Sequence, residues 1–133
     1  MTAPDPQPPK VAPRVTGVAH IFAATGYSLA GARRMWRETA FRHEVLAFAL
    51  SIVVLVVVGA TFVELAILIG LFALVGAVEA LNTAIECIVD HVSPDWSVAA
   101  RDAKDIGSFA VMCSLIIAGL FVVVTVARHL LGV

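Results

Sequence analysis

Charged side chains are scarce in this sequence. Only 14% of its 133 residues are charged, whereas 60% are hydrophobic; soluble domains average roughly 25% charged and 45–50% apolar residues. A chain with so little polar surface cannot cover itself with water-facing groups, so the composition predicts an integral membrane protein. The net charge of −1 also lacks the basic excess typical of nucleic-acid binding, and we expect no nucleic-acid partner.

Cysteine is nearly absent, and proline is concentrated at one end. Cys87 and Cys113 lie in apolar runs without histidines at metal-ligand spacing, so we interpret both as small buried hydrophobic residues. Five of the six prolines fall within residues 1–15, which predicts a disordered tail there. The chain does not open on a basic segment followed by an apolar one, so no cleaved signal peptide is expected.

Residues 16–42 have the pattern of an amphipathic helix. Apolar side chains recur at i, i+3 and i+4 from Val18 to Trp36, and arginines gather near the end of the segment. An apolar stripe that ends in arginines and a tryptophan is typical of a helix lying in the membrane interface. The alternative is an amphipathic helix of an ordinary core. We expect a surface helix over about residues 16–42.

Long apolar segments follow. The uncharged part of the middle one, residues 65–78, is too short to cross about 30 Å of hydrocarbon at 1.5 Å per residue. That span must therefore continue through Glu79, Asn82 and Glu86. The sequence predicts an all-α membrane protein with a surface helix and three membrane-spanning helices. Their expected bounds are about 45–63, 65–90 and 98–128.

The basic residues indicate how the chain crosses the membrane. Six of the nine lysines and arginines precede the first span, and Arg101 and Lys104 lie between the second and third. The connection between the first two spans carries none. Because cytoplasmic segments are enriched in lysine and arginine, we expect a cytoplasmic N-terminus.

Four polar residues of the second span lie on one face. At about 100° per residue, Glu79, Asn82, Glu86 and Asp90 fall within a sector of about 80°. One alternative is helix packing, because polar side chains join helices in lipid with about 0.6–2 kcal/mol each. Three carboxylates on one face, however, repel each other unless protons or cations lie between them. This polar stripe therefore predicts a functional site.

Depth separates the two glutamates of this stripe. Counted from Glu64, Glu79 lies about 22 Å and Glu86 about 33 Å along the helix. Desolvation favours the protonated form of the deeper Glu79, which suits a general base. Glu86 lies near the cytoplasmic interface, where Mg²⁺ can reach it. Magnesium takes few carboxylates and completes its shell with water and phosphate oxygens.

Two further polar clusters lie at the same level. The segment ETAFRHE, residues 38–44, precedes the first span, and RDAKDIGS, residues 101–108, begins the third. Carboxylates for a metal and a lysine for phosphate are the minimum for phosphoryl transfer. The sequence contains neither a G-x-x-x-x-G-K-[ST] loop nor the glycine loop of protein kinases. A nucleotide would have to be bound without those folds.

Three ordered motifs resemble one family over about residues 16–127. E-x-A-F-R-x-E, V-E-x-L-N-x-A-I-E-x-x-V-D and A-K-D-x-G-S-x-A-V are similar to the small bacterial integral-membrane diacylglycerol kinases. The resemblance implies a homotrimer in the bacterial inner membrane that phosphorylates diacylglycerol to phosphatidic acid with ATP and Mg²⁺. His20 stands where the family carries an arginine, and one residue is missing between Trp36 and Glu38.

The same resemblance implies roles for individual residues. Glu79 would be the general base, assisted by Asn82 and Lys104, and Glu38 and Glu86 would bind the metal. Nucleotide contacts would come from His20, Tyr27, Glu38, Glu86, Asp95, Trp96, Ser97, Lys104 and Asp105. Contacts to the lipid substrate would come from Ala40, Phe41, Arg42, His43, Glu44, Glu79 and Ser108.

Three alternatives remain open. Undecaprenol kinases share the fold but resemble N-F-R-I-H and A-K-D-I-A-A, where this chain has A-F-R-H-E and A-K-D-I-G-S. A small proton-coupled transporter would explain Glu79 but not Lys104, Asp105 or Glu38. A non-catalytic helix-packing subunit would leave the carboxylates unexplained. The motifs favour diacylglycerol kinase.

Overall fold

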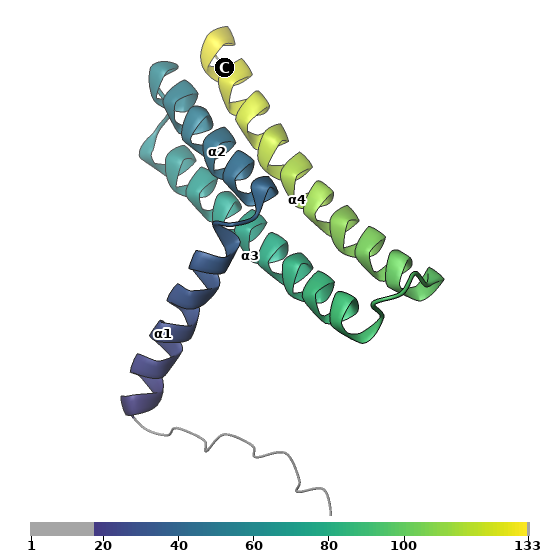
Figure 1. The fold of residues 1–133 in the computed structure, drawn as a ribbon. Helices are drawn as coiled ribbons and strands as arrows, with labels where there is room; N and C mark the ends of the chain where they lie inside the picture. The colour runs from purple at the N-terminus through teal and green to yellow at the C-terminus, as the bar shows by residue number, and fades with distance from the viewer. Residues whose placement is uncertain (1–17, 133) are drawn as a thin grey trace, which may run out of the picture. The chain divides into compact units, whose positions relative to one another are not determined.

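The computed structural model describes residues 18–132 (Figure 1). The proline-rich tail predicted for residues 1–15 lies outside this range. The described residues form four helices and no strand, so the predicted all-α class is confirmed. The chain divides into two units, residues up to Arg34 and residues from Met35 onward, and each is described by itself. The helices are α1 (Val18–Met35), α2 (Thr39–Val57), α3 (Phe62–Val92) and α4 (Val98–Leu131).

Helix α1 is shorter than the surface helix predicted for residues 16–42. It ends at Met35, with Arg33 and Arg34 in its last turn, where positive charge stabilises the helix dipole. Glu38 has an extended backbone and is the N-cap of α2, which breaks the helical path. Residues 39–44 therefore form the first turns of α2 rather than the end of the surface helix.

Helices α2, α3 and α4 are long and apolar enough to cross a membrane, as the sequence predicts. The bound between the first two spans differs from the prediction, since α2 ends at Val57 rather than at residue 63. The chain turns at Gly59, whose positive φ of 84° is readily adopted only without a side chain. The predicted bound at residue 63 was wrong because Glu64 was taken to mark the end of the first span, whereas it lies inside α3.

The start of α3 is capped and tied to the end of α4. Thr61 Oγ1 accepts a hydrogen bond from the Glu64 backbone N–H (3.3 Å), and Glu64 Oε2 accepts one from the Thr61 N–H (2.7 Å). This capping box satisfies two backbone donors that the helix leaves unpaired. The same Glu64 oxygen lies 3.0 Å from His129 Nε2. Polar contacts therefore join the start of α3 to the end of α4, at the end of the pair opposite the α3–α4 connection.

Helices α3 and α4 form a long antiparallel pair, and α2 packs beside the N-terminal half of α3 (Figure 1). Few side chains are buried between the three helices. Leu55, Leu68 and Val75 form the apolar part of this core, whereas Glu44, Glu79, Asn82, Thr83, Ser114 and Thr125 are also buried. Apolar side chains instead cover the outer faces, which is the reverse of a soluble bundle and suits a lipid environment.

Replacing the capping threonine tests the contribution of the capping box at the start of α3. Thr61→Ala should lower the free energy of unfolding by about 1 kcal/mol, because the Glu64 N–H loses its acceptor. Reversible unfolding in mixed micelles of detergent and SDS measures this. Thr39→Ala is the matched control, since Thr39 Oγ1 only accepts a hydrogen bond from Arg42 on the surface of α2. Equal losses in both variants would contradict a capping role.

Candidate active site

The polar stripe of α3 changes from buried to exposed along its length. Glu79 is 5% exposed and Asn82 is 8% exposed, whereas Glu86 is half-buried and Asp90 is exposed. This order follows the depth inferred for these residues in the membrane. The structure therefore brings one end of the stripe into the helical bundle and leaves the other at its edge.

Asn82 links the stripe to helix α4. Its Nδ2 donates a hydrogen bond to Glu86 Oε1 (2.9 Å), one turn along the same helix. Its buried Oδ1 has no hydrogen-bond partner among the described residues. Gly107 of α4 faces that oxygen so closely that a Cβ at this position would collide with it. Gly107 thus provides the space that Asn82 occupies.

Glu79 lies within electrostatic reach of three other carboxylates. The charges of Glu86 and Glu38 act on Glu79, and the charge of Glu79 acts on Glu44. Glu44 is 8% exposed, and its Oε2 has no hydrogen-bond partner in the described part of the chain. Such a group of acids in a bundle of low polarity is costly unless protons or cations offset the charge. The cluster is the strongest structural indication of a chemical site.

Lys104 meets the stripe at its exposed end. Its Nζ donates a hydrogen bond to Asp90 Oδ1, which joins α4 to α3. The neighbouring Asp105 is exposed and lies 3.9 Å from Arg101, and Ser108 is exposed as well. Lys104 and Gly107 are therefore members of the 101–108 segment that contact the stripe, whereas Asp105 and Ser108 are exposed.

The predicted nucleotide residues of the α3–α4 connection lie at the same end of the bundle. Ser97 caps α4 by accepting a hydrogen bond from the Ala100 N–H (3.2 Å), and its hydroxyl lies 3.1 Å from that of Ser93. Asp95 and Trp96 are exposed between them. Ser97 thus has a structural role in ending the connection, whereas Asp95 and Trp96 remain accessible.

Two predicted contacts lie on α1, which belongs to the other unit. Tyr27 is exposed on that helix, and the side chain of His20 lies outside the described side chains. The predicted lipid contacts Ala40–Glu44 form the first turns of α2. Within them only Glu44 is buried, and Phe41 packs edge-to-face against Trp36 with ring centroids 6.4 Å apart.

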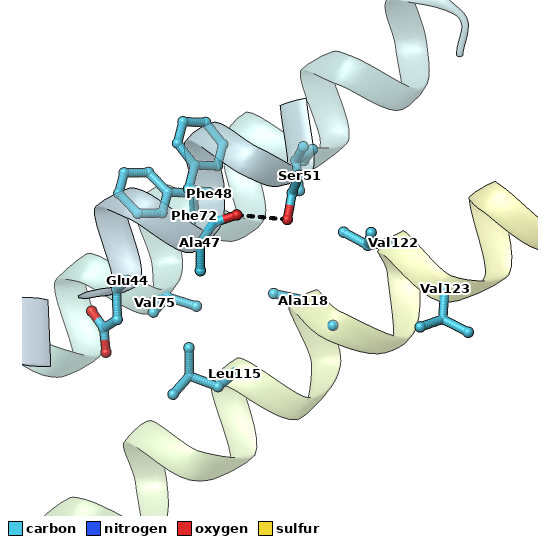
Figure 2. A pocket seen from close by; sticks show the side chains of 12 residues that line it. Glu44, Ala47, Phe48, Ser51, Phe72, Val75, Leu115, Ala118, Val122 and Val123 are labelled. Carbon is cyan, nitrogen blue, oxygen red and sulfur yellow. Dashed lines mark hydrogen bonds between the residues drawn. The ribbon is translucent and has the colours of Figure 1, made fainter. Parts of the chain in front are cut away.

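A cavity of about 330 Å³ lies between α2, α3 and α4 (Figure 2). Glu44 is its acidic lining residue, and Figure 2 shows Leu115 and Ala118 of α4 across from it. Phe48 and Phe72 stack with centroids 4.0 Å apart along the wall. Because the remaining lining is almost entirely apolar, the cavity suits a hydrocarbon chain with one polar end. Sequence patterns did not reveal it, since its lining residues come from three helices.

The carboxylates fit a metal that needs few protein ligands. Within residues 18–132 no group of three or more histidine, cysteine, aspartate or glutamate side chains is arranged to hold an ion. A dedicated cage, such as that of structural zinc, is therefore not formed by these residues. Glu38 and Glu86 are carboxylates within electrostatic reach of Glu79, and carboxylate oxygens in small number are ligands that Mg²⁺ accepts together with water and phosphate oxygens.

Gly107 is a site residue that was not predicted from the sequence, although its motif was noted. This glycine stands inside the motif A-K-D-x-G-S, one residue before the predicted Ser108. Only the packing of α4 on α3 reveals that it opposes Asn82. Asp90 was visible as part of the stripe, but its partner Lys104 is set by the antiparallel pairing of the two helices.

The close approach of Gly107 and Asn82 can be tested by adding one methyl group. Gly107→Ala should lower the free energy of unfolding by about 1–3 kcal/mol, because overpacking displaces Asn82 from its hydrogen bond with Glu86. Gly70→Ala is the control, since a Cβ there meets nothing within 4 Å. Its higher helix propensity should raise stability slightly. Reversible unfolding in mixed micelles measures both variants. If the free energy of unfolding changed in the same direction in both, the close contact between Gly107 and Asn82 would be contradicted.

Comparisons with known proteins agree with the motifs. The family model for prokaryotic diacylglycerol kinase matches residues 26–126. A diacylglycerol kinase of Sinorhizobium sp. is 50% identical over 106 residues, which cover 80% of this chain and 77% of the relative. The diacylglycerol kinases of Escherichia coli K12 and Pseudomonas aeruginosa are 38% and 41% identical and cover 81% and 88% of this chain, and 89% and 93% of their own lengths. With its three apolar helices, this bacterial membrane protein belongs to the prokaryotic diacylglycerol kinase family.

Proposed function

We propose that this protein transfers the γ-phosphoryl group of ATP to diacylglycerol, giving phosphatidic acid and ADP. The observation that carries the proposal is the position of Glu44. This buried carboxylate lines the apolar cavity and is electrostatically coupled to Glu79 of the polar stripe. A lipid whose chain occupies the cavity would therefore present its polar end to a group of acids. The names of the relatives support the same activity.

Glu79 is the proposed general base. It accepts the proton of the diacylglycerol hydroxyl while that oxygen forms a bond to the γ-phosphorus and the bond between this phosphorus and the bridging oxygen breaks. ADP leaves with the bridging oxygen. The buried position of Glu79, one helical turn from Asn82 on the polar stripe, supports this role.

The nucleotide is proposed to bind at the exposed end of the stripe. Lys104 would contact its phosphates, and Glu38 and Glu86 would hold Mg²⁺, which when bound offsets phosphate charge. Asn82 orients Glu86 through their hydrogen bond. Further contacts to the nucleotide are proposed for His20, Tyr27, Asp95, Trp96, Ser97 and Asp105.

The lipid is proposed to enter from the bilayer with its hydroxyl near the interface. Residues 40–44 and Ser108 would contact its polar part, and the cavity would take one acyl chain. Holding both substrates at one interface supplies proximity, which contributes strongly to two-substrate reactions. We further propose a homotrimer in the inner membrane with a cytoplasmic N-terminus, because basic residues concentrate before the first span.

Replacing the proposed base separates chemistry from binding. Glu79→Gln should reduce kcat by about 10²–10⁴-fold, because an amide cannot accept the hydroxyl proton. The affinity for a non-hydrolysable ATP analogue should remain within about twofold of wild type, since twofold is under 0.5 kcal/mol. Glu64→Gln, in the first turn of α3 and far from the polar stripe, is the matched control and should retain turnover. Unchanged turnover of Glu79→Gln would refute the base assignment.

The acceptor is tested by offering diacylglycerol and undecaprenol separately in mixed micelles with radiolabelled ATP. Diacylglycerol should be phosphorylated, and phosphorylation of undecaprenol alone would overturn the proposal.

The cavity gives a second test with long-chain and short-chain diacylglycerol. Ala118→Leu should lower kcat/KM for the long-chain lipid about tenfold relative to the short-chain one, because the added methyl groups fill the site. Ala110→Leu, on the exposed surface of the same helix, should leave the ratio of the two kcat/KM values unchanged.

A further inference from the structure

Asp90 is the member of the polar stripe that has no part in the reaction proposed above. It lies in the last turn of α3, and its Oδ1 accepts a hydrogen bond from Lys104 Nζ of α4. The two residues are separated by the whole α3–α4 connection. Their ion pair therefore places the lysine side chain relative to the stripe.

The lysine has a second carboxylate within reach. Glu86 precedes Asp90 by four residues on the same face of α3, which is about 6 Å along the helix axis. The charge of Glu86 also acts on Lys104. The ammonium group thus feels the charge of two acids on successive turns, and its hydrogen bond is made to Asp90, the more exposed of the two.

The choice between these acids has a chemical consequence. An ammonium group bound to Glu86 would offset the charge that a cation needs there, and it would compete with the hydrogen bond from Asn82. It would also be withdrawn from an anionic ligand at the bundle edge. A hydrogen bond to Asp90 avoids both effects, because it keeps the lysine one turn away.

The pair is too exposed to be explained by stability. The side chains of Lys104 and Asp90 are 38% and 66% exposed. Ion pairs at such positions are screened by water and contribute little to folding. The nearby cation Arg101 pairs with Asp102 at 2.8 Å, so in the described residues it does not take the place of Lys104 at Asp90.

We propose that Asp90 is a positioning residue that holds the Lys104 ammonium group one helical turn away from Glu86. In this position Lys104 is available to the phosphates of a nucleotide, and Glu86 keeps its charge for a cation. The inference rests on the proposed function, in which these two residues bind nucleotide and metal, and it adds the residue that keeps them apart.

The test measures binding by the full-length protein in detergent micelles. Asp90→Asn should weaken binding of a non-hydrolysable ATP analogue, measured by calorimetry, and of Mn²⁺, measured by electron paramagnetic resonance, each by about fivefold or more, as expected for coupled residues in contact. The unfolding midpoint should stay unchanged. Asp90→Glu should restore both affinities. Asp102→Asn removes the same charge from an exposed pair nearby and should leave both affinities unchanged.

A double-mutant cycle with Lys104→Met decides whether Asp90 acts through the lysine. In the Lys104→Met protein, adding Asp90→Asn should change the affinities less than about twofold, because no ammonium group remains to be positioned. An equal effect in both backgrounds, or no effect of Asp90→Asn in either, would overturn the proposal. If Lys104→Met binds the analogue as wild type does, the positioning role fails too. Failure of the proposed function itself is seen separately, as absent phosphorylation of diacylglycerol by the wild-type protein.

Discussion

Carboxylates inside a bundle of low polarity repel one another, and most of this structure can be understood from how that repulsion is accommodated. Glu44 and Glu79 are almost fully buried, and Glu79 lies within reach of the charges of Glu38 and Glu86. An arrangement of this kind loses stability compared with an apolar core of the same shape. Such an arrangement persists in proteins where binding of protons, cations or substrates offsets the charge, which is why these carboxylates are the basis of the proposed function.

The surrounding helices reduce this cost by grading the environment along one face. Asn82 donates to Glu86 where the stripe begins to emerge, and Asp90 is already exposed and bonded to Lys104. The buried carboxylate of Glu79 thus lies inside the bundle, whereas the more exposed Glu86 and Asp90 have polar partners. A single helical face therefore holds two glutamates in different surroundings, and the roles proposed for Glu79 and Glu86 rest on this difference.

The spans and the stripe could be predicted from the sequence because both depend on local periodicity. The short uncharged run before Glu79 required the second span to include the acids, and a spacing of three or four residues placed them on one face. The break at Glu38 was not predicted, since the apolar pattern continues across it. The turn at Gly59 was missed because charged residues were taken as the ends of the spans, whereas Glu64 lies within α3 as part of its capping box.

The contacts between helices could not be predicted, because they depend on register. The opposition of Gly107 and Asn82, the bond from Lys104 to Asp90 and the cavity beside Glu44 each join segments far apart in the chain. The motif A-K-D-x-G-S indicated the family, but it did not show that Gly107 makes room for the side-chain amide of Asn82. The family comparison identifies the type of enzyme, and the packing explains why particular residues stand where they do.

The polar closure at Glu64 and His129 has a mechanical consequence for the whole bundle. With the α3–α4 connection at one end and this closure at the other, the two long helices are fastened at both extremities and resist separation. Helix α2 makes far fewer contacts with either of them, yet it forms one wall of the cavity. Moving α2 away from the other two helices would therefore break fewer contacts than separating α3 from α4, so the wall of the cavity that α2 forms is its least firmly held side.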